Sequence, residues 1–303
     1  MILQNLRLYI MIFFLAITFC IIKYHNQQNE IYVQAVEKKI YNHSADMFGI
    51  SKIYQTQENG REWYINMTDP SEDKQFSISY DELSLKKQPD NSWRVGGAEV
   101  KLNVNSSGKE LWRNVEITGY LKIVGFLSFN ETVVTEDFDR DYDISWIARS
   151  GKHSNSIPCD GTALIGSINI NGFVSWKKEI WHTGGYTGDR AKQKITDSIF
   201  NRWIGWKTIV YNTENNSAVK MESYIDNKNS GYWIKVSEII DNGGWNAKNS
   251  NQIFYTANCG KKIDHIITES KPYVTFRTDN IIWDFKNLSI REIDPNKMIY
   301  VPP

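Results

Sequence analysis

The sequence predicts an all-β protein, an antiparallel sandwich of two sheets of the jelly-roll type. Short segments of alternating or β-branched residues recur along the chain, and turns rich in Asn and Gly separate them. Only Asp189–Trp203 has the pattern of a helix, and only for a few turns. Many short strands without alternating helices are typical of sandwiches and jelly rolls.

The expected strands follow one another at short intervals. We expect them at Glu62–Met67, Ser92–Asn103, Val115–Phe129, Ile144–Ala148, Gly161–Ile170, Val174–His182, Trp206–Tyr211, Val219–Ile225, Tyr232–Ile240, Tyr273–Arg277 and Ile281–Ile293. The piece Val219–Trp233 has the pattern of a hairpin, because a polar turn rich in Asn and Gly joins its two strands.

The N-terminus has the layout of an export signal. After Arg7, the apolar run Leu8–Ile22 is followed by Lys23 and a polar stretch. The run is shorter than the roughly 20 residues that cross a bilayer as a helix, and no clear cleavage site precedes Gln34. A cleaved signal and an uncleaved anchor therefore both remain open.

These observations divide the chain into four parts. We expect residues 1–23 to be a hydrophobic helix that acts as a signal peptide or signal anchor, and residues 24–45 to be a polar leader. Residues 46–295 then form one jelly-roll domain, and residues 296–303 a tail. The domain is expected to be extracellular or on the cell surface, and membrane-anchored by residues 8–22 if the signal is not cleaved.

Two cysteines, Cys159 and Cys259, lie outside the apolar run, and no Cys or His spacing suggests a zinc site. In an oxidising compartment we expect this pair to form one disulfide, which would stabilise the fold by about 4 to 5 kcal/mol. Two buried free thiols are the alternative.

The formal net charge is zero, with 35 basic and 35 acidic residues. We therefore expect no nucleic-acid partner, and contact with a membrane only through the N-terminal segment.

Candidate chemistry is concentrated between Trp112 and Tyr186. Along the strand that begins at Val115, polar and apolar residues alternate, so that one face is polar and the other apolar. The polar face carries Glu116, Thr118, Tyr120 and Lys122. We expect it to line a groove suited to sugar recognition or proton transfer. The 11 Trp and 16 Tyr of the chain also supply rings on which sugars can stack, although most are expected in the core.

The chain resembles the concanavalin A-like lectin/glucanase jelly-roll superfamily in the order of its segments. A short helix, the stretch Trp203–Asn212, an aromatic and Asp-containing hairpin and the strand Phe285–Ile293 follow one another as they do there. It looks most like the alginate- and glucuronan-lyase branch and uncharacterised secreted archaeal proteins of that type. The resemblance covers about Asp46 to Asp294. A glycoside hydrolase of this superfamily is not expected, because its paired carboxylates are missing where Thr118 follows Glu116.

The resemblance implies β-elimination on a uronate, which needs a cation to neutralise the carboxylate, a base and an acid. The expected catalytic residues are Arg149 as the cation, His153 or His182 as the base, and Tyr120 or Tyr186 as acid or base. The expected substrate-binding residues are Glu116, Lys122, Lys178, Glu179 and Trp181.

The chain departs from the motifs of those lyases. In place of Arg-Ser/Thr-Glu-Leu-Arg, Gln-Ile/Val-His and Tyr-Phe-Lys-Ala-Gly-x-Tyr it has Arg113–Ile117, Glu179–His182 and Ser223–Asp226. In a regular strand, Lys178 and His182 would share one face while Glu179 and Trp181 share the other. The pairing of Gln with His is therefore not reproduced.

Other interpretations stay open for these residues. Glu116 can instead form a salt bridge to Lys122 or Arg113 on an exposed face, and Arg149 with His153 can form a loop cluster near Cys159. An acidic row, Asp137, Asp139, Asp141 and Asp143, is compatible with Ca²⁺ or with a solvated loop. No other cofactor or metal is expected.

We therefore expect an exported or surface-anchored protein that engages a polysaccharide, acting as a polysaccharide lyase if it is an enzyme. The alternatives are a non-catalytic carbohydrate-binding module and a cell-envelope or adhesion protein.

Overall fold

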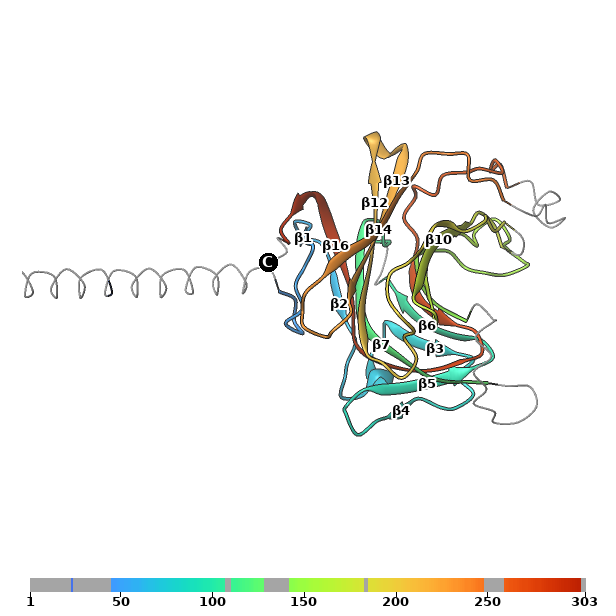
Figure 1. Ribbon diagram of the computed structural model, residues 1–303. Coiled ribbons are helices and arrows are strands. Elements are labelled where there is room, and N and C mark those ends of the chain that lie inside the picture. Colours follow the sequence, from blue (N-terminus) through green and yellow to red (C-terminus); the bar gives the residue numbers. More distant parts are fainter. Residues whose placement is uncertain are drawn as a thin grey trace, which may run out of the picture. The chain divides into compact units, whose positions relative to one another are not determined.

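The computed structural model describes residue 23 and residues 45–106, 110–127, 142–182, 185–247 and 259–300 (Figure 1). The chain divides into two compact units, Met1–Ser51 and Lys52–Pro303. In the first unit, the Asp46 carboxylate accepts hydrogen bonds from the backbone N–H groups of Phe48 and Ile50, which closes a turn. The fold and the site belong to the second unit.

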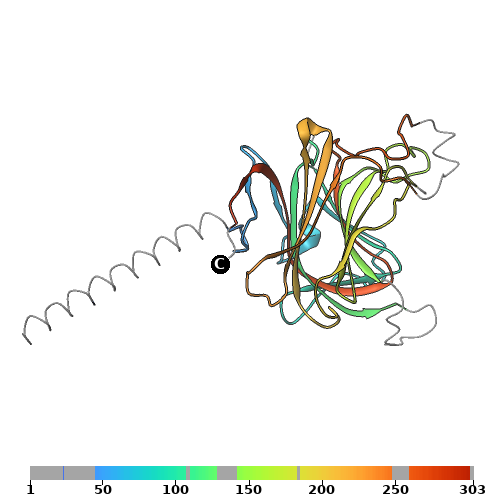
Figure 2. The same cartoon turned by 45° about the horizontal axis from the view of Figure 1, so that its top comes forward.

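Two antiparallel sheets form the second unit, and they appear as facing layers in both views (Figures 1 and 2). The described strands are β1 (Tyr54–Thr56), β2 (Glu62–Tyr64), β3 (Phe76–Ser79), β4 (Lys86–Lys87), β5 (Trp93–Gly97), β6 (Val100–Asn105), β7 (Val115–Phe126), β8 (Asp143–Ser150), β9 (Ala163–Asn169), β10 (Phe173–Glu179), β11 (Arg190–Lys194), β12 (Ile204–Thr213), β13 (Ala218–Asp226), β14 (Ile234–Asp241), β15 (Tyr273–Thr278) and β16 (Ile281–Met298). Two 3₁₀ turns, η1 (Pro70–Glu72) and η2 (Glu214–Asn216), join them.

The strand order places elements from distant parts of the chain side by side. Sheet 1 has the order β14-β13-β12-β7-β16-β5-β4, and β1 and β2 also pair with β16. Sheet 2 has the order β11-β10-β9-β8-β15-β6-β3. The last strand, β16, therefore lies near the middle of sheet 1, between β7 and β5.

The core fills the space between the two sheets. Trp146 of β8 and Trp206 of β12 pack against each other across it, with ring centroids 4.6 Å apart. Gly119 of β7 lies so close to this layer that a Cβ there would be 3.4 Å from Trp146 and 2.4 Å from Leu288. The inward residues of β7, such as Ile117 and Leu121, are fully buried, which stabilises the fold by about 1.5–3 kcal/mol for each side chain.

The all-β sandwich expected from the sequence is confirmed, and so is the hairpin, which β13 and β14 form. The helix expected at Asp189–Trp203 is wrong. Its first half is the edge strand β11, which pairs with β10. A short, mostly exposed segment of charged residues suits an edge strand as well as a helix, and here the ladder of β10 provides its hydrogen bonds.

The expected strand Ser92–Asn103 is divided in the structure. Gly97 ends β5 in sheet 1, and the chain turns and enters sheet 2 as β6 from Val100. At its other end the unit extends further than expected, because β16 continues through Pro295 to Met298.

The expected disulfide is confirmed, since Cys159 and Cys259 are bonded with their Cα atoms 5.2 Å apart. Among the residues with described placement, no helix is both long and apolar enough to cross a membrane. The run Leu8–Ile22 and the expected N-terminal helix lie outside the described residues.

Candidate functional site

A cavity of about 660 Å³ lies on the outer face of sheet 2, the face directed away from the core. Strand alternation builds it. In β6, Val100, Leu102 and Val104 are buried in the core, whereas Lys101 and Asn103 line the cavity. The same alternation recurs in β15, β8, β9 and β10, so the cavity floor consists of every second residue of neighbouring strands.

One row of side chains crosses the floor from strand to strand. The floor row consists of Ser77, Asn103, Thr275, Ile147, Ile165 and Lys177, and each is in register with the next. Because neighbouring strands lie about 4.8 Å apart, a row across six strands extends over about 24 Å. Its ends are polar and its centre is apolar, and Tyr186 packs against the apolar centre, where Ile147 and Ile165 are 6% and 4% exposed.

Hydrogen bonds orient the polar end of the floor row. The Thr275 hydroxyl donates to Oδ1 of Asn103 at 2.8 Å. Nδ2 of Asn103 is thereby directed toward the Ser79 hydroxyl, 3.5 Å away, in the neighbouring row. The amide donor of Asn103 is therefore held in a fixed orientation at the cavity floor.

The cations that line the cavity are largely paired with nearby carboxylates. Lys101 lies 2.7 Å from Glu99, and Arg277 contacts Glu99 at 3.2 Å and Asp279 at 3.1 Å. Lys177 lies more loosely, 3.9 Å from Asp143. The cavity is therefore polar without a strong excess of positive charge, and an anionic ligand has to compete with these carboxylates.

One wall of the cavity combines an imidazole, a carboxylate and a phenol. Nε2 of His153 is 2.8 Å from Oε2 of Glu179, and its Nδ1 is 3.0 Å from the Gly151 carbonyl. Both ring nitrogens of His153 are therefore engaged with protein oxygens. Tyr186 is placed beside Glu179 by an isolated β-bridge. Burial, and then the negative charge of Glu179, raise the pKa of the Tyr186 phenol, which therefore keeps its proton.

Glu179 has an unusual environment for a carboxylate. Its side chain lines the cavity although the residue is only 2% exposed. Its Oε1 atom is buried with no hydrogen-bond partner among the residues that the structure describes. A buried acceptor without a partner is unfavourable, and because the atom has no accessible surface, a ligand reaches it only if the Glu179 side chain moves.

The loop that carries His153 is tied to the sandwich. Asp160 accepts hydrogen bonds from the Lys152 backbone at 3.0 Å and from the Lys271 ammonium at 2.9 Å. The disulfide of Cys159 lies next to Asp160. A Cβ at Gly151 would lie 1.7 Å from the Asp160 carbonyl oxygen, so the close return of the loop requires glycine at this position.

Arg149, the expected neutralising cation, lies inside the protein with no exposed surface. It has a positive φ of 53° at a bulge in the pairing of β8 with β15. Its guanidinium donates to the carbonyl oxygens of Arg113 at 3.2 Å and Ile267 at 2.5 Å. Burial, and then the charge of Arg113, lower its pKa to about 9. Arg277 lines the cavity, whereas Arg149 does not.

The segment after Glu179 differs from the expected regular strand. β10 ends at Glu179, and Trp181 is buried in a cluster with Ile180 and Ala247. His182 packs edge to face against His153, with ring centroids 5.6 Å apart. Burial, and then the charge of His153, lower the pKa of His182. His182 thus supports the wall from behind His153.

Lys178 points away from the cavity. It is fully buried, its ammonium lies 2.7 Å from Asp241, and it donates to the His265 carbonyl oxygen at 2.6 Å. Of the two expected substrate contacts at the end of β10, Glu179 lines the cavity and Lys178 does not.

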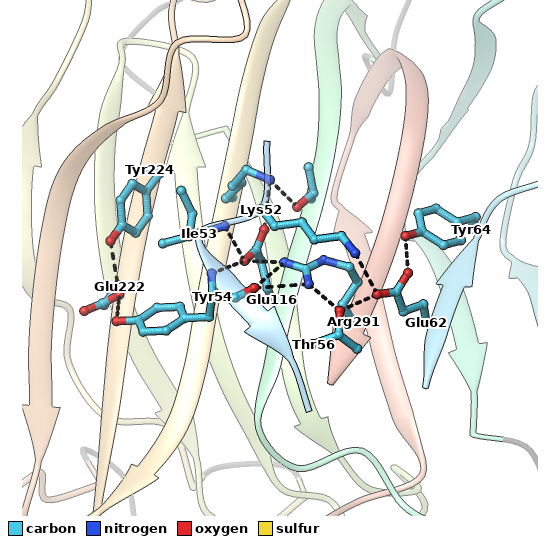
Figure 3. A network of polar contacts seen from close by, with 12 residues as sticks. Lys52, Ile53, Tyr54, Thr56, Glu62, Tyr64, Glu116, Glu222, Tyr224 and Arg291 are labelled. Carbon is cyan, nitrogen blue, oxygen red and sulfur yellow. Dashed lines mark hydrogen bonds and ion pairs between the residues drawn. The ribbon is translucent and has the colours of Figure 1, made fainter. Parts of the chain in front are cut away.

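The polar face of β7 belongs to the other side of the sandwich, and its expected exposure is wrong. Its alternation is as expected, but Glu116 is 1% exposed and Tyr120 is 8% exposed. β1 covers Glu116, which accepts hydrogen bonds from the backbone N–H groups of Ile53 at 3.1 Å and Tyr54 at 3.4 Å (Figure 3). Alternation identifies a face of a strand, but it does not reveal which distant segment covers that face.

Glu116 is the centre of a buried ion cluster. Its carboxylate lies 2.9 Å from Lys207 and 2.7 Å from Arg291, so its partners are neither Lys122 nor Arg113. Burial alone would raise its pKa, but the charges of Arg291 and Lys207 lower it to about 2. On the same face, Tyr120 donates to Asp226 at 3.1 Å and Lys122 lies 3.1 Å from Asp284.

The site as described therefore contains His153, Glu179 and Tyr186 from the expected set. The sequence interpretation missed Arg277, Asn103 and Thr275, although the alternation of Tyr273–Arg277 places Thr275 and Arg277 on one face. Within the described ranges no group of three or more His, Cys, Asp or Glu residues is placed to hold a metal ion. Asp137, Asp139 and Asp141 of the acidic row lie outside those ranges.

No protein-family model matches the sequence, and no curated protein does. Among solved structures, the chain is similar to peanut lectin with a 9mer peptide (8% identity, 77% of this chain and 97% of that chain, TM-score 0.39). It is similar to arcelin-5, a lectin-like defense protein from Phaseolus vulgaris (5%, 77% and 98%, TM-score 0.39). It is also similar to the exoplasmic/lumenal domain of VIP36 in a Ca²⁺/Man2-bound form (9%, 78% and 91%, TM-score 0.40). At these low identities and TM-scores, the similarities carry no conclusion on function.

Proposed function

We propose that this protein binds a polysaccharide chain in the cavity of sheet 2. The floor row supports this function most directly. Sugars present hydroxyl groups around their rings and C–H groups on their faces, and the row offers Asn103 and Thr275 beside Ile147 and Ile165. Binding sites commonly combine such apolar surface with a few fixed polar groups. A row of about 24 Å suits a chain of several sugar units better than a single ring.

The confirmed disulfide supports an exported location. Bonds such as Cys159–Cys259 persist in oxidising compartments outside the cytosol. An exported or surface-anchored protein would also meet polysaccharides of cell walls and matrices.

A substitution at the floor tests the binding. Asn103→Ala removes the oriented amide, and we expect the Kd for the bound glycan to rise about 3- to 10-fold, as for the loss of one hydrogen bond. The matched control is Asn296→Ala, because Asn296 is exposed at the far end of β16. Isothermal titration against a panel of neutral and acidic polysaccharides, with and without Ca²⁺, measures the Kd of both variants and of the wild type. A wild-type protein that binds no member of the panel would overturn the proposal and favour an envelope or adhesion role.

A second candidate function is β-elimination on a uronate-containing glycan, and the grouping of Glu179, His153 and Tyr186 at one wall favours it. In this reaction a base takes the proton beside the uronate carboxylate, a C=C double bond forms, and the bond to the leaving oxygen breaks. Glu179 is the base once its side chain turns Oε1 into the cavity, since both nitrogens of His153 are engaged. His153 positions Glu179, Tyr186 protonates the leaving oxygen, and Arg277 neutralises the carboxylate.

The unsaturated product of such a reaction absorbs in the near ultraviolet. With a polyuronate as substrate, Glu179→Gln is expected to lower kcat by about 10²- to 10⁴-fold while binding is retained. Arg277→Ala is expected to impair turnover and affinity together, because its charge meets the carboxylate before and during the reaction. If the wild type binds polyuronates but gives no absorbing product on any of them, the protein is a binding module.

A further inference from the structure

Tyr80 is a large aromatic side chain left exposed at the cavity. Its residue is 65% exposed, and it follows directly after β3 among the residues that line the cavity. Tyr232, an exposed tyrosine at 37%, lies in the hairpin turn of sheet 1. A single exposed aromatic residue needs no explanation, but the backbone of Tyr80 distinguishes it.

The backbone of Tyr80 is held in a strained conformation. Its φ is +63°, in the left-handed region that bulky residues rarely adopt. Such a conformation costs about 1–3 kcal/mol and persists only where the surroundings impose it. Strain of this kind is typical of residues whose side chain has a role in binding.

The segment after Tyr80 shows what imposes this conformation. The Asp81 carboxylate accepts hydrogen bonds from the backbone of Leu83 at 3.2 Å and of Gly96 at 3.1 Å. Glu82 accepts one from the Ala98 backbone at 3.0 Å. The Tyr80 carbonyl oxygen also lies so close to Gly97 that a Cβ there would be 2.2 Å from it. The ring is therefore presented by a segment fixed against the end of β5.

Polar groups lie beside the exposed ring. The Lys101 ammonium lies over the ring, 5.7 Å from its centroid, and Lys101 is in register with Ser79, the residue before Tyr80. An aromatic face next to hydrogen-bond donors matches a pyranose ring, which has C–H groups on its face and hydroxyl groups at its edge.

We propose, as an extension that depends on the proposed glycan binding, that Tyr80 is the stacking platform of a pyranose subsite at the β3 end of the cavity. One sugar ring of the chain lies on the Tyr80 face, and its edge hydroxyls meet Lys101 and Ser79. The next units then extend across the floor row. Removal of the ring should weaken binding, and an aromatic replacement should preserve it.

Two substitutions separate binding from folding. Tyr80→Ala removes the ring, and we expect the Kd for the glycan identified in the panel to rise about tenfold. Tyr80→Gly removes the ring and also relieves the strained φ, so it should bind as weakly while its thermal unfolding temperature equals or exceeds that of the wild type. Tyr80→Phe, which keeps the ring face, and Tyr232→Ala, on the other sheet, are expected to bind like the wild type.

The outcomes distinguish the subsite from the binding function as a whole. If Tyr80→Ala and Tyr80→Gly bind like the wild type while Asn103→Ala binds more weakly, the subsite is refuted and glycan binding stands. If the wild type binds no glycan, the proposed function fails, and the subsite fails with it.

Discussion

Glu116 shows how a buried charge is tolerated in this fold. Its carboxylate has two cationic partners, Lys207 and Arg291, and two backbone N–H groups of the β1 segment as donors. Removing charges from water is unfavourable, and a buried cluster is stable only when each charge keeps its partners. Loss of this carboxylate would remove the anionic partner that Lys207 and Arg291 share.

We expect Glu116→Gln to lower the free energy of unfolding by about 3–5 kcal/mol, because it removes the negative charge that Lys207 and Arg291 share inside the protein. Urea denaturation measures this change. Glu110→Gln is the matched control, since Glu110 is 79% exposed and 3.8 Å from Arg61; it should change stability by less than about 1 kcal/mol. Equal effects of the two substitutions would contradict the buried ion cluster.

The same cluster predicts a pH dependence. The pKa of Glu116 is lowered in the folded protein from its usual 4.5 to about 2, which corresponds to about 3 kcal/mol. This contribution is fully present above pH 4.5 and is lost as the pH falls through 2. The stability difference between the wild type and Glu116→Gln should therefore shrink progressively below pH 4.5 in urea titrations. A difference that stays constant down to pH 2 would argue against this assignment.

At the residue scale, the sequence predicts alternation well and surroundings poorly. The sequence singles out His153, Glu179 and Tyr186, and all three line the same cavity. Arg149 was placed at the site by its chain position, but a bulge turns it inward. The local pattern tells on which side of a strand a side chain lies. Whether that side chain is exposed depends on segments far away in the chain.

At the element scale, the loop between β8 and β9 depends on its disulfide. The chain between Gly151 and Gly161 carries His153 to the cavity and is fixed by Asp160 and by the bond from Cys159 to Cys259. This bond joins residues that are 100 positions apart, so it strongly restricts the unfolded chain.

Replacing both Cys159 and Cys259 by Ser is expected to lower the free energy of unfolding by about 4 to 5 kcal/mol. It should also weaken glycan binding, because the loop that carries His153 loses an anchor. Denaturation and titration of the variant give the two values. Cys20→Ser is the control, since it removes a cysteine outside this bond, and it should resemble the wild type. Unchanged stability of the double variant would contradict the structural role.

Strand positions were predicted where alternation was long, and missed where it was short. β7, β13 and β16 follow clear patterns, whereas β1 and β4 span only three and two residues. The division of one expected strand into β5 and β6 has a local cause in Gly97 and the turn after it. Which sheet each half joins is decided by packing against strands distant in sequence, which a pattern cannot supply.

At the scale of the whole sandwich, the outer faces of the two sheets differ in what covers them. On sheet 1, β1 and the ion cluster of Glu116 cover much of the polar surface. On sheet 2 the corresponding face keeps the cavity with its floor row. The alternation of β7 predicts a polar outer face, but whether that face stays open to a ligand depends on the path of β1.

The central place of β16 in sheet 1 has a consequence for the order in which the protein is completed. β16 pairs with β7 on one side and with β5 on the other, and it also pairs with β1 at Tyr54 and Met298. A ribosome releases β16 well after β5 and β7, so a nascent chain presents the unpaired edges of β7 and β5 until Ile281–Met298 emerge. Such edges favour aggregation. A chaperone that keeps the chain extended would protect these edges until β16 closes the sheet.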